Sequence, residues 1–234
     1  MKFAIIAAGE GSRLAAEGID APKPLVQLHG EALIDRLIRI FMQHDPEEIV
    51  VICNDRTTLV AQHLNELQRD GIKGRPVPLR FLVKSTPSSM HSFYEISKWL
   101  SDGPFILTTV DTIFREQEFA DYVKAFEQTT GDGLMGVTSY VDDEKPLWVG
   151  TDTDMRITGF FDASDTCTYI SAGIYGLHSN TIATLHQCIE HGESRMRNFQ
   201  RALITDGRTL QAYSFNQVFD IDHASDLHKA EQYV

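Results

Sequence analysis

The sequence is poor in cysteine and contains no long apolar run. Its three cysteines, Cys53, Cys167 and Cys188, are widely spaced and odd in number, so they form neither a CxxC pair nor a disulfide framework. No apolar run approaches the roughly 20 residues that span a bilayer, and the apolar N-terminus runs into a glycine turn rather than a signal-cleavage site. These absences exclude a disulfide-stabilised domain and a membrane-spanning chain, and they favour a cytoplasmic location.

Positive charge is also scarce. Lysine and arginine number 21 against 33 aspartate and glutamate residues, so the formal net charge is −12. A protein that binds nucleic acid or an anionic membrane surface through its overall field normally carries the opposite sign. We therefore expect a small-molecule partner, with no nucleic acid and no membrane. If that partner is anionic, the site must gather its few cations locally.

Strand-like and helix-like patterns alternate through the first half of the chain. Compact apolar runs predict strands over Phe3–Ala7, Ile49–Cys53, Leu79–Val83, Phe105–Val110 and Leu134–Val141, and helical spacing predicts helices over Ala32–Phe41, Leu59–Leu67, Phe93–Leu100 and Phe119–Gln128. In the helix at 59–67, Leu59, Leu64 and Leu67 are expected to face inward. The alternation predicts an α/β fold with a mostly parallel, doubly wound, Rossmann-like sheet.

The pattern changes after Gly133. Short polar loops join predicted strands at Trp148–Thr151, Arg156–Phe161 and Tyr169–Leu177, which indicates a small antiparallel extension of the sheet. Helices are predicted over Ile182–Ile189, Met196–Ile204 and from about Ala224, with a strand at Leu210–Phe215. No repeat or Pro/Gly-rich linker divides the chain, so residues 1–234 are expected to form one domain.

A glycine-containing loop, Ala7-Ala8-Gly9-Glu10-Gly11-Ser12, follows the first predicted strand. Glycines let the backbone approach a phosphate and direct N–H groups at it. A GxG pattern alone is weak, and a simple tight turn is the better interpretation of it. Leu14 stands where a dinucleotide-binding loop needs glycine or alanine, and no GKS or GKT follows, so neither common phosphate-loop motif fits.

Two cations strengthen the case for a phosphate site. Arg13 follows the loop directly, and Lys23 lies between Pro22 and Pro24, which restrict the backbone around it. Together they could clamp a polyphosphate. The alternative is a solvated loop with two ordinary surface charges, and the residues alone favour neither interpretation.

The segment AAGEGSRL, followed by PKPLVQLHGEALIDRLI, resembles the N-terminal signature of nucleotidyltransferases that make NDP-sugars and related activated compounds. That family includes NDP-sugar pyrophosphorylases and phosphocholine cytidylyltransferases, and its motif reads approximately AAGxGxRL…PKPL. The resemblance implies the fold of nucleotide-diphospho-sugar transferases over the whole chain. It also implies that the nucleoside triphosphate is bound by Ala8, Gly9, Gly11, Ser12, Arg13 and Lys23.

Asp111 ends the predicted strand Phe105–Val110, where ligands of open α/β sheets bind. A carboxylate facing a polyphosphate is a plausible Mg²⁺ ligand, although an aspartate there is more often a turn residue or a helix cap. In the family resemblance this is the position of a metal-binding aspartate, usually preceded by glycine. Here Val110 precedes it.

A second carboxylate is expected near the C-terminus, in Phe219-Asp220-Ile221-Asp222-His223. The segment resembles the family's closing segment, which carries the second metal ligand before a final helix. Spacing favours Asp222, and Asp220 is the alternative because both would point to the same face of an extended segment. Asp222 could instead be the N-cap of the last helix.

The loop Lys84–His91 corresponds by resemblance to the family's nucleobase loop, which commonly reads Gly-Thr-Ala. Thr86, Ser88 and Ser89 replace that pattern, so the location carries over and the base specificity does not. Structurally, Ser92 and Glu95 have the spacing of a capping box.

Ser171, Gly173 and Tyr175 lie in a segment that resembles the family strand lining the acceptor pocket. Sugar-1-phosphate enzymes often carry Glu-Lys-Pro upstream of that strand, with the glutamate on sugar hydroxyls. The chain has Gly159-Phe160-Phe161-Asp162-Ala163 there. This difference leaves the acceptor open between a sugar phosphate and an alcohol phosphate of the choline type.

The resemblance implies a Mg²⁺-dependent enzyme. An acceptor phosphate would attack the α-phosphorus of a nucleoside triphosphate and release pyrophosphate, with Arg13 and Lys23 as catalytic cations and Asp111 and Asp222 as metal ligands. One alternative is a glycosyltransferase that uses an NDP-sugar, but its usual DxD motif is missing at Val110-Asp111-Thr112. The other is a catalytically silent nucleotide- or metabolite-sensing module.

Overall fold

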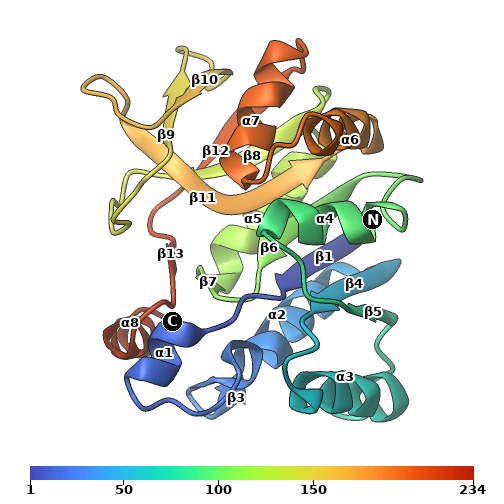
Figure 1. Ribbon diagram of the computed structural model, residues 1–234. Coiled ribbons are helices and arrows are strands. Elements are labelled where there is room, and N and C mark those ends of the chain that lie inside the picture. The colour runs from blue at the N-terminus through green and yellow to red at the C-terminus, as the bar shows by residue number, and fades with distance from the viewer.

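The computed structural model describes all residues 1–234, and its core is a nine-stranded sheet with helices on both faces (Figure 1). The strands of the first half are β1 (Lys2–Ala7), β4 (Glu48–Cys53), β5 (Leu79–Val83) and β6 (Phe105–Thr109). β1 pairs in parallel with β4 and β6, and β4 pairs in parallel with β5. The predicted doubly wound parallel arrangement is confirmed for this half.

The second half adds the antiparallel pairs. β11 (Tyr169–Leu177) runs antiparallel to β6, to β8 (Gly133–Thr138) and to β9 (Trp148–Thr151). β10 (Ile157–Phe161) closes that edge against β9, and β12 (Leu210–Phe215) pairs in parallel with β8. β11 therefore joins the parallel half to the antiparallel extension that was expected.

Two apolar cores cover the two faces of the sheet. In β1, Phe3 and Ile5 face one core, and Ala4 and Ile6 face the other, as expected for a strand buried on both sides. The first core packs under α2 (Leu33–Phe41), α3 (Thr58–Asp70) and α5 (Glu116–Glu127). The second packs under α4 (Ser89–Ser97), α6 (Ile182–Glu190) and α7 (Met196–Thr205).

Short helices, strand pairs and turns connect these layers. They are α1 (Ser12–Ala16), the hairpin β2 (Gln27–Leu28) and β3 (Glu31–Ala32), the pair β7 (Thr112–Ile113) and β13 (Phe219–Asp220), α8 (Ala224–Tyr233), and 3₁₀ turns at Lys23–Leu25, Met42–His44 and Ser179–Thr181. In Figure 1, α8 lies beside α1, so the end of the chain returns to its beginning. No helix is long and apolar enough to cross a bilayer.

Two local expectations were wrong. Leu59 is 53% exposed instead of facing the core. α3 begins at Thr58 with Thr57 as its N-cap, and in that register Val60, Leu64 and Leu67 form the buried stripe. The strand predicted to reach Val141 ends at Thr138, whose Oγ1 accepts a hydrogen bond from the Tyr140 N–H and turns the chain.

Candidate active site

A cleft of about 530 Å³ opens at the carboxyl ends of β1 and β6. We call it the nucleotide cleft. It is lined by all the residues predicted to bind nucleotide and by the two preferred metal ligands: Ala8, Gly9, Gly11, Ser12, Arg13, Lys23, Thr86, Ser88, Ser89, Asp111 and Asp222. The fold therefore brings together at one edge of the sheet residues from five separate parts of the sequence.

The glycine loop leaves β1 and enters α1 through Gly11. Gly11 has a φ of 63°, in the left-handed region that favours glycine, and a Cβ there would lie 3.2 Å from the Cβ of Lys23. Glycine at this position thus lets the segment that carries Lys23 pack directly on the loop. A Cβ at Gly9 would meet nothing within 4 Å, so protein packing does not require that glycine.

Asn54 holds the glycine loop from the neighbouring strand, and the sequence analysis missed it. It follows β4 directly, and its Nδ2 donates to the carbonyl oxygens of Gly9 at 3.0 Å and Ala8 at 3.3 Å. Nearby, Arg56 forms an ion pair with Glu10 of the same loop. Because β4 is parallel and adjacent to β1, a polar residue just past its end could have been recognised as a loop contact.

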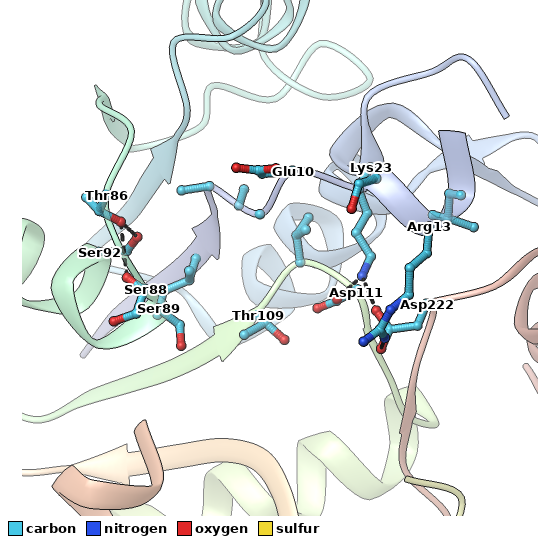
Figure 2. A pocket seen from close by; sticks show the side chains of 18 of the residues that line it. Glu10, Arg13, Lys23, Thr86, Ser88, Ser89, Ser92, Thr109, Asp111 and Asp222 are labelled. Carbon is cyan, nitrogen blue, oxygen red and sulfur yellow. Dashed lines mark hydrogen bonds and ion pairs between the residues drawn. The ribbon is translucent and has the colours of Figure 1, made fainter. Parts of the chain in front are cut away.

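Four charged side chains meet on the other side of the cleft (Figure 2). The Lys23 ammonium forms an ion pair with the Asp111 carboxylate and lies 2.9 Å from Asp222 Oδ1. Arg13 Nη1 lies 2.7 Å from the other Asp222 oxygen. Lys23 is only 9% exposed, so its charge is compensated almost wholly by protein carboxylates. We call these four residues the charge cluster.

The pKa values in the cluster follow from this geometry. Burial alone would lower the pKa of Lys23, but the Asp111 and Asp222 carboxylates outweigh it, and the pKa is raised. Burial alone would raise the pKa of Asp222, but Lys23 and then Arg13 outweigh it, and the pKa is lowered. Lys23 therefore stays protonated and Asp222 stays ionised near neutral pH.

Strand pairing explains why Asp111 and Asp222 meet. β13 pairs with β7 so that Asp220 lies opposite Thr112, and the N–H of Ile221 donates to the carbonyl oxygen of Asp111 at 3.1 Å. Asp222 is not a helix cap, because α8 is capped by His223. The Asp226 carboxylate accepts from the N–H groups of Asp222 and His223. The Asp222 side chain is thereby left to Arg13 and Lys23.

Asp220 lies apart from the ion pairs of the cluster. Its backbone is paired with Thr112, and its side chain lines the neighbouring hollow, to which it is open. Desolvation by nearby protein and then the like charge of Asp111 raise the pKa of Asp220 above its usual range.

The predicted nucleobase loop forms the opposite wall of the nucleotide cleft (Figure 2). Ser88 is the N-cap of α4, and Thr86 Oγ1 lies 2.6 Å from Ser92 Oγ. The expected capping box of Ser92 and Glu95 was wrong, because the helix begins at Ser89 and Ser92 is buried within it. Glu95 instead lies 2.8 Å from Lys84 in an ion pair.

A second hollow of about 610 Å³ adjoins the nucleotide cleft, and we call it the acceptor hollow. It is lined by Ser171, Gly173 and Tyr175, which were expected to border an acceptor and whose role stays a prediction. The two spaces share four lining residues: Arg13, Ser88, Ser89 and Asp222. The acceptor hollow therefore reaches two residues of the charge cluster, Arg13 and Asp222.

The acceptor hollow also contains residues that the sequence analysis missed. The triplet Glu144-Lys145-Pro146 lies between β8 and β9. The family triplet was expected later in the chain, at residues 159–163. Glu144 and Lys145 nevertheless line the acceptor hollow. Arg195 and Gln200, at the start of α7 and within it, line the same space. The triplet itself was visible in the sequence, but the contribution of α7 depends on how the helix packs.

Comparison with known proteins gives consistent relatives. A family model described as nucleotidyl transferase matches residues 2–234. A UTP–glucose-1-phosphate uridylyltransferase of Haloferax volcanii is 24% identical over 243 residues, covering 99% of this chain and 96% of that protein. The fold is shared with the inositol-1-phosphate CTP transferase of T. maritima, with a TM-score of 0.79, 17% identity, and 99% and 95% of the two chains covered. A candidate glucose-1-phosphate thymidylyltransferase from Bacillus anthracis superposes with a TM-score of 0.84 at 18% identity, covering 99% and 94% of the chains.

Proposed function

Since this chain belongs to the nucleotidyl transferase family, and so transfers a nucleoside monophosphate from a nucleoside triphosphate to a phosphorylated acceptor, we propose how its own residues divide that work. The charge cluster carries the proposal, because it lies where the nucleotide cleft and the acceptor hollow meet. The triphosphate occupies the cleft and the acceptor phosphate enters from the hollow. The family match favours this reaction over an NDP-sugar glycosyltransferase and over a silent sensing module.

The reaction is an in-line displacement at phosphorus. An oxygen of the acceptor phosphate bonds to the α-phosphorus while the bond from the α-phosphorus to the bridging oxygen breaks, and pyrophosphate leaves. Little covalent chemistry falls to the protein, which positions the groups and neutralises developing charge. Lys23 and Arg13 supply the positive charge that offsets the developing negative charge, and the backbone of Ala8, Gly9 and Gly11 holds the triphosphate.

Asp111 and Asp222 would hold a Mg²⁺ ion. The fit rests on the donor set: two carboxylates face one cation, the Lys23 ammonium, and Mg²⁺ typically takes one or two carboxylates together with phosphate oxygens. When bound, the ion would offset the phosphates' negative charge and draw the two substrates together.

The nucleotide cleft and the acceptor hollow determine specificity for different substrates. Thr86, Ser88 and Ser89 line the nucleotide cleft, and we expect them to contact the nucleobase. Ser171, Gly173 and Tyr175 line the acceptor hollow, and we expect them to contact the acceptor. We propose a sugar phosphate as the acceptor, in line with the named substrate of the Haloferax volcanii relative. Glu144 can accept hydrogen bonds from the hydroxyl groups of the sugar. Three unpaired cysteines support a cytoplasmic setting for the enzyme.

A matrix of pyrophosphate-release assays tests the proposal. Each of CTP, UTP, GTP, ATP and dTTP is incubated with Mg²⁺ and a panel of sugar 1-phosphates and alcohol phosphates. We expect release with at least one pair. Silence throughout, with nucleotide binding retained, would instead support the sensing module, and sugar transfer from an NDP-sugar without pyrophosphate release would support the glycosyltransferase.

A further inference from the structure

The segment 222–224, between β13 and α8, brings Asp222 to the charge cluster from near the end of the sequence. On its upstream side the segment is anchored to the strand pair of β7 and β13, because the N–H of Ile221 donates to the carbonyl oxygen of Asp111 at 3.1 Å. This anchor fixes the residue before Asp222. The place of the Asp222 carboxylate therefore also depends on what holds the residues that follow it.

Glu17 holds those residues from α1, which lies beside α8 in Figure 1. Its Oε2 accepts a hydrogen bond from the backbone N–H of Ala224 at 2.6 Å, and its Oε1 lies 2.6 Å from Nδ1 of the His223 ring. The Ala224 N–H and then the His223 ring lower the pKa of Glu17. Glu17 is therefore ionised near neutral pH, and both of its oxygens are engaged by the segment.

Arg13 and Glu17 lie on the same helical turn and bind neighbouring parts of the segment. The N–H of Glu17 donates to the carbonyl oxygen of Arg13 at 3.2 Å, and side chains spaced in this way share one face of a helix. Arg13 Nη1 lies 2.7 Å from Asp222 Oδ2, while Glu17 binds the two residues that follow Asp222. α1 thus holds Asp222 directly through its carboxylate and indirectly through the backbone behind it.

The helix α8 does not need Glu17 in order to begin. Its capping box is formed by His223 and Asp226, and the Asp226 carboxylate accepts from the N–H groups of Asp222 and His223. Because Asp226 belongs to α8 itself, it shapes the turn but does not attach it to another element. Glu17 comes from a different element and attaches the turn to α1.

We propose that Glu17 is a positioning residue for the transfer reaction: it holds the segment 222–224 against α1 and so places the Asp222 carboxylate where it can hold the metal ion together with Asp111. This inference rests on the proposed function. Glu17 lines neither the nucleotide cleft nor the acceptor hollow, so its effect passes through Asp222. Without Glu17, the strand pair still holds Ile221, but Asp222 can move with the start of α8.

Two substitutions of Glu17 test the inference. Glu17→Ala removes both bonds to the segment, whereas Glu17→Gln keeps a carbonyl oxygen that can accept from the Ala224 N–H. Pyrophosphate release is measured with the fastest pair of substrates. We expect the KM for the Mg²⁺–nucleotide complex to rise about tenfold in Glu17→Ala, because a hydrogen bond to a charged group stabilises the placed turn by about that factor. In Glu17→Gln the rise should be no more than about threefold.

Glu190→Ala removes an exposed glutamate from the end of α6 and is the matched control, with no change expected in KM. A purely structural role for Glu17 would reduce the amount of active enzyme, and hence the apparent kcat, without changing KM. An unchanged KM in Glu17→Ala would therefore overturn the inference and leave the proposed function intact.

Binding is followed separately from turnover. Isothermal titration calorimetry without acceptor compares the tightest-binding of CTP, UTP, GTP, ATP and dTTP in excess Mg²⁺ and in EDTA. Mg²⁺ should tighten binding to the natural protein, and Glu17→Ala should lose about tenfold in affinity in Mg²⁺ but nothing in EDTA. An equal loss in both conditions, or no tightening by Mg²⁺ in the natural protein, would overturn the inference. If no pair of substrates releases pyrophosphate, the proposed function fails, and the calorimetry still decides whether Glu17 acts through the metal site.

Discussion

The two spaces of the active site are built differently. The nucleotide cleft stands on parallel strands, and its side chains already bind one another: Lys23 is buried between carboxylates, and Asn54 holds the glycine loop. The acceptor hollow lies on antiparallel strands and is lined at its far end by exposed, unpaired side chains such as Lys145 and Arg195. The side chains proposed to act on the triphosphate are therefore held in place by one another, whereas the acceptor hollow has donors and charges left for a ligand.

Removal of a proposed metal ligand should have the largest effect. Asp111→Asn keeps the shape of the side chain but removes the charge, and we expect turnover to fall at least about a hundredfold because charge stabilisation at the α-phosphate is lost. Removal of Mg²⁺ with EDTA should have a similar effect, reversed by added Mg²⁺. Pyrophosphate release measures both.

Asp121→Asn, an exposed position on α5, is the control, and thermal unfolding should show that both variants remain folded. Turnover of Asp111→Asn close to that of the unmodified enzyme would contradict the assignment of this carboxylate and would erase the contrast between the two spaces.

Loss of the support for the glycine loop should have the second-largest effect. Asn54→Ala removes the donor to the carbonyl oxygens of Ala8 and Gly9, so the loop N–H groups lose their preset orientation. We expect the KM for the nucleoside triphosphate to rise about tenfold, with a smaller change in kcat. Asn65→Ala on α3 is the control. An unchanged KM would mean that the loop is held well enough without Asn54.

An acceptor-side substitution should act on the other substrate. Glu144→Gln keeps an acceptor oxygen but removes its charge, so we expect the KM for a sugar phosphate to rise by about threefold while the KM for the nucleotide stays the same. Steady-state kinetics with each substrate varied in turn measure both constants. A change in the nucleotide KM as large as that in the acceptor KM would show that the two spaces are not independent.

The smallest effect concerns the scaffold of the nucleotide half. His63 Nε2 lies 2.6 Å from Asp35 Oδ1, and this bond raises the pKa of His63. A raised folded-state pKa stabilises the fold fully below the unfolded value of about 6.5, and that stabilisation is lost as the pH rises through the folded value.

Relative to His63→Gln, the natural protein should therefore gain about 0.5 kcal/mol of unfolding free energy at pH 6 and lose most of that advantage by pH 8.5. Urea unfolding at the two pH values measures the difference. A constant difference would show that the pair does not titrate in this range, and the nucleotide KM should not change in either case.

Local motifs pointed to residues that the fold brings to one cleft, and the binding roles of these residues stay predictions. The glycine loop, Lys23 between its prolines and Asp111 at the end of a strand each carry their signal within a few residues, and strand alternation predicted the sheet. Leu59 was misplaced because the register of α3 is set by the cap at Thr57. Asn54 and Gln200 were missed because each acquires its role only from a partner on another element, Gly9 and Ser171.

The return of the C-terminal segment to the start of the fold has a consequence for synthesis of the protein. Asp222 and Lys23, which touch, are separated by 199 positions in the sequence. On the ribosome, the strands of the nucleotide half emerge long before Asp222 does. A nascent chain can pair Lys23 with Asp111 early, but the charge cluster is completed only after Asp222 has also emerged.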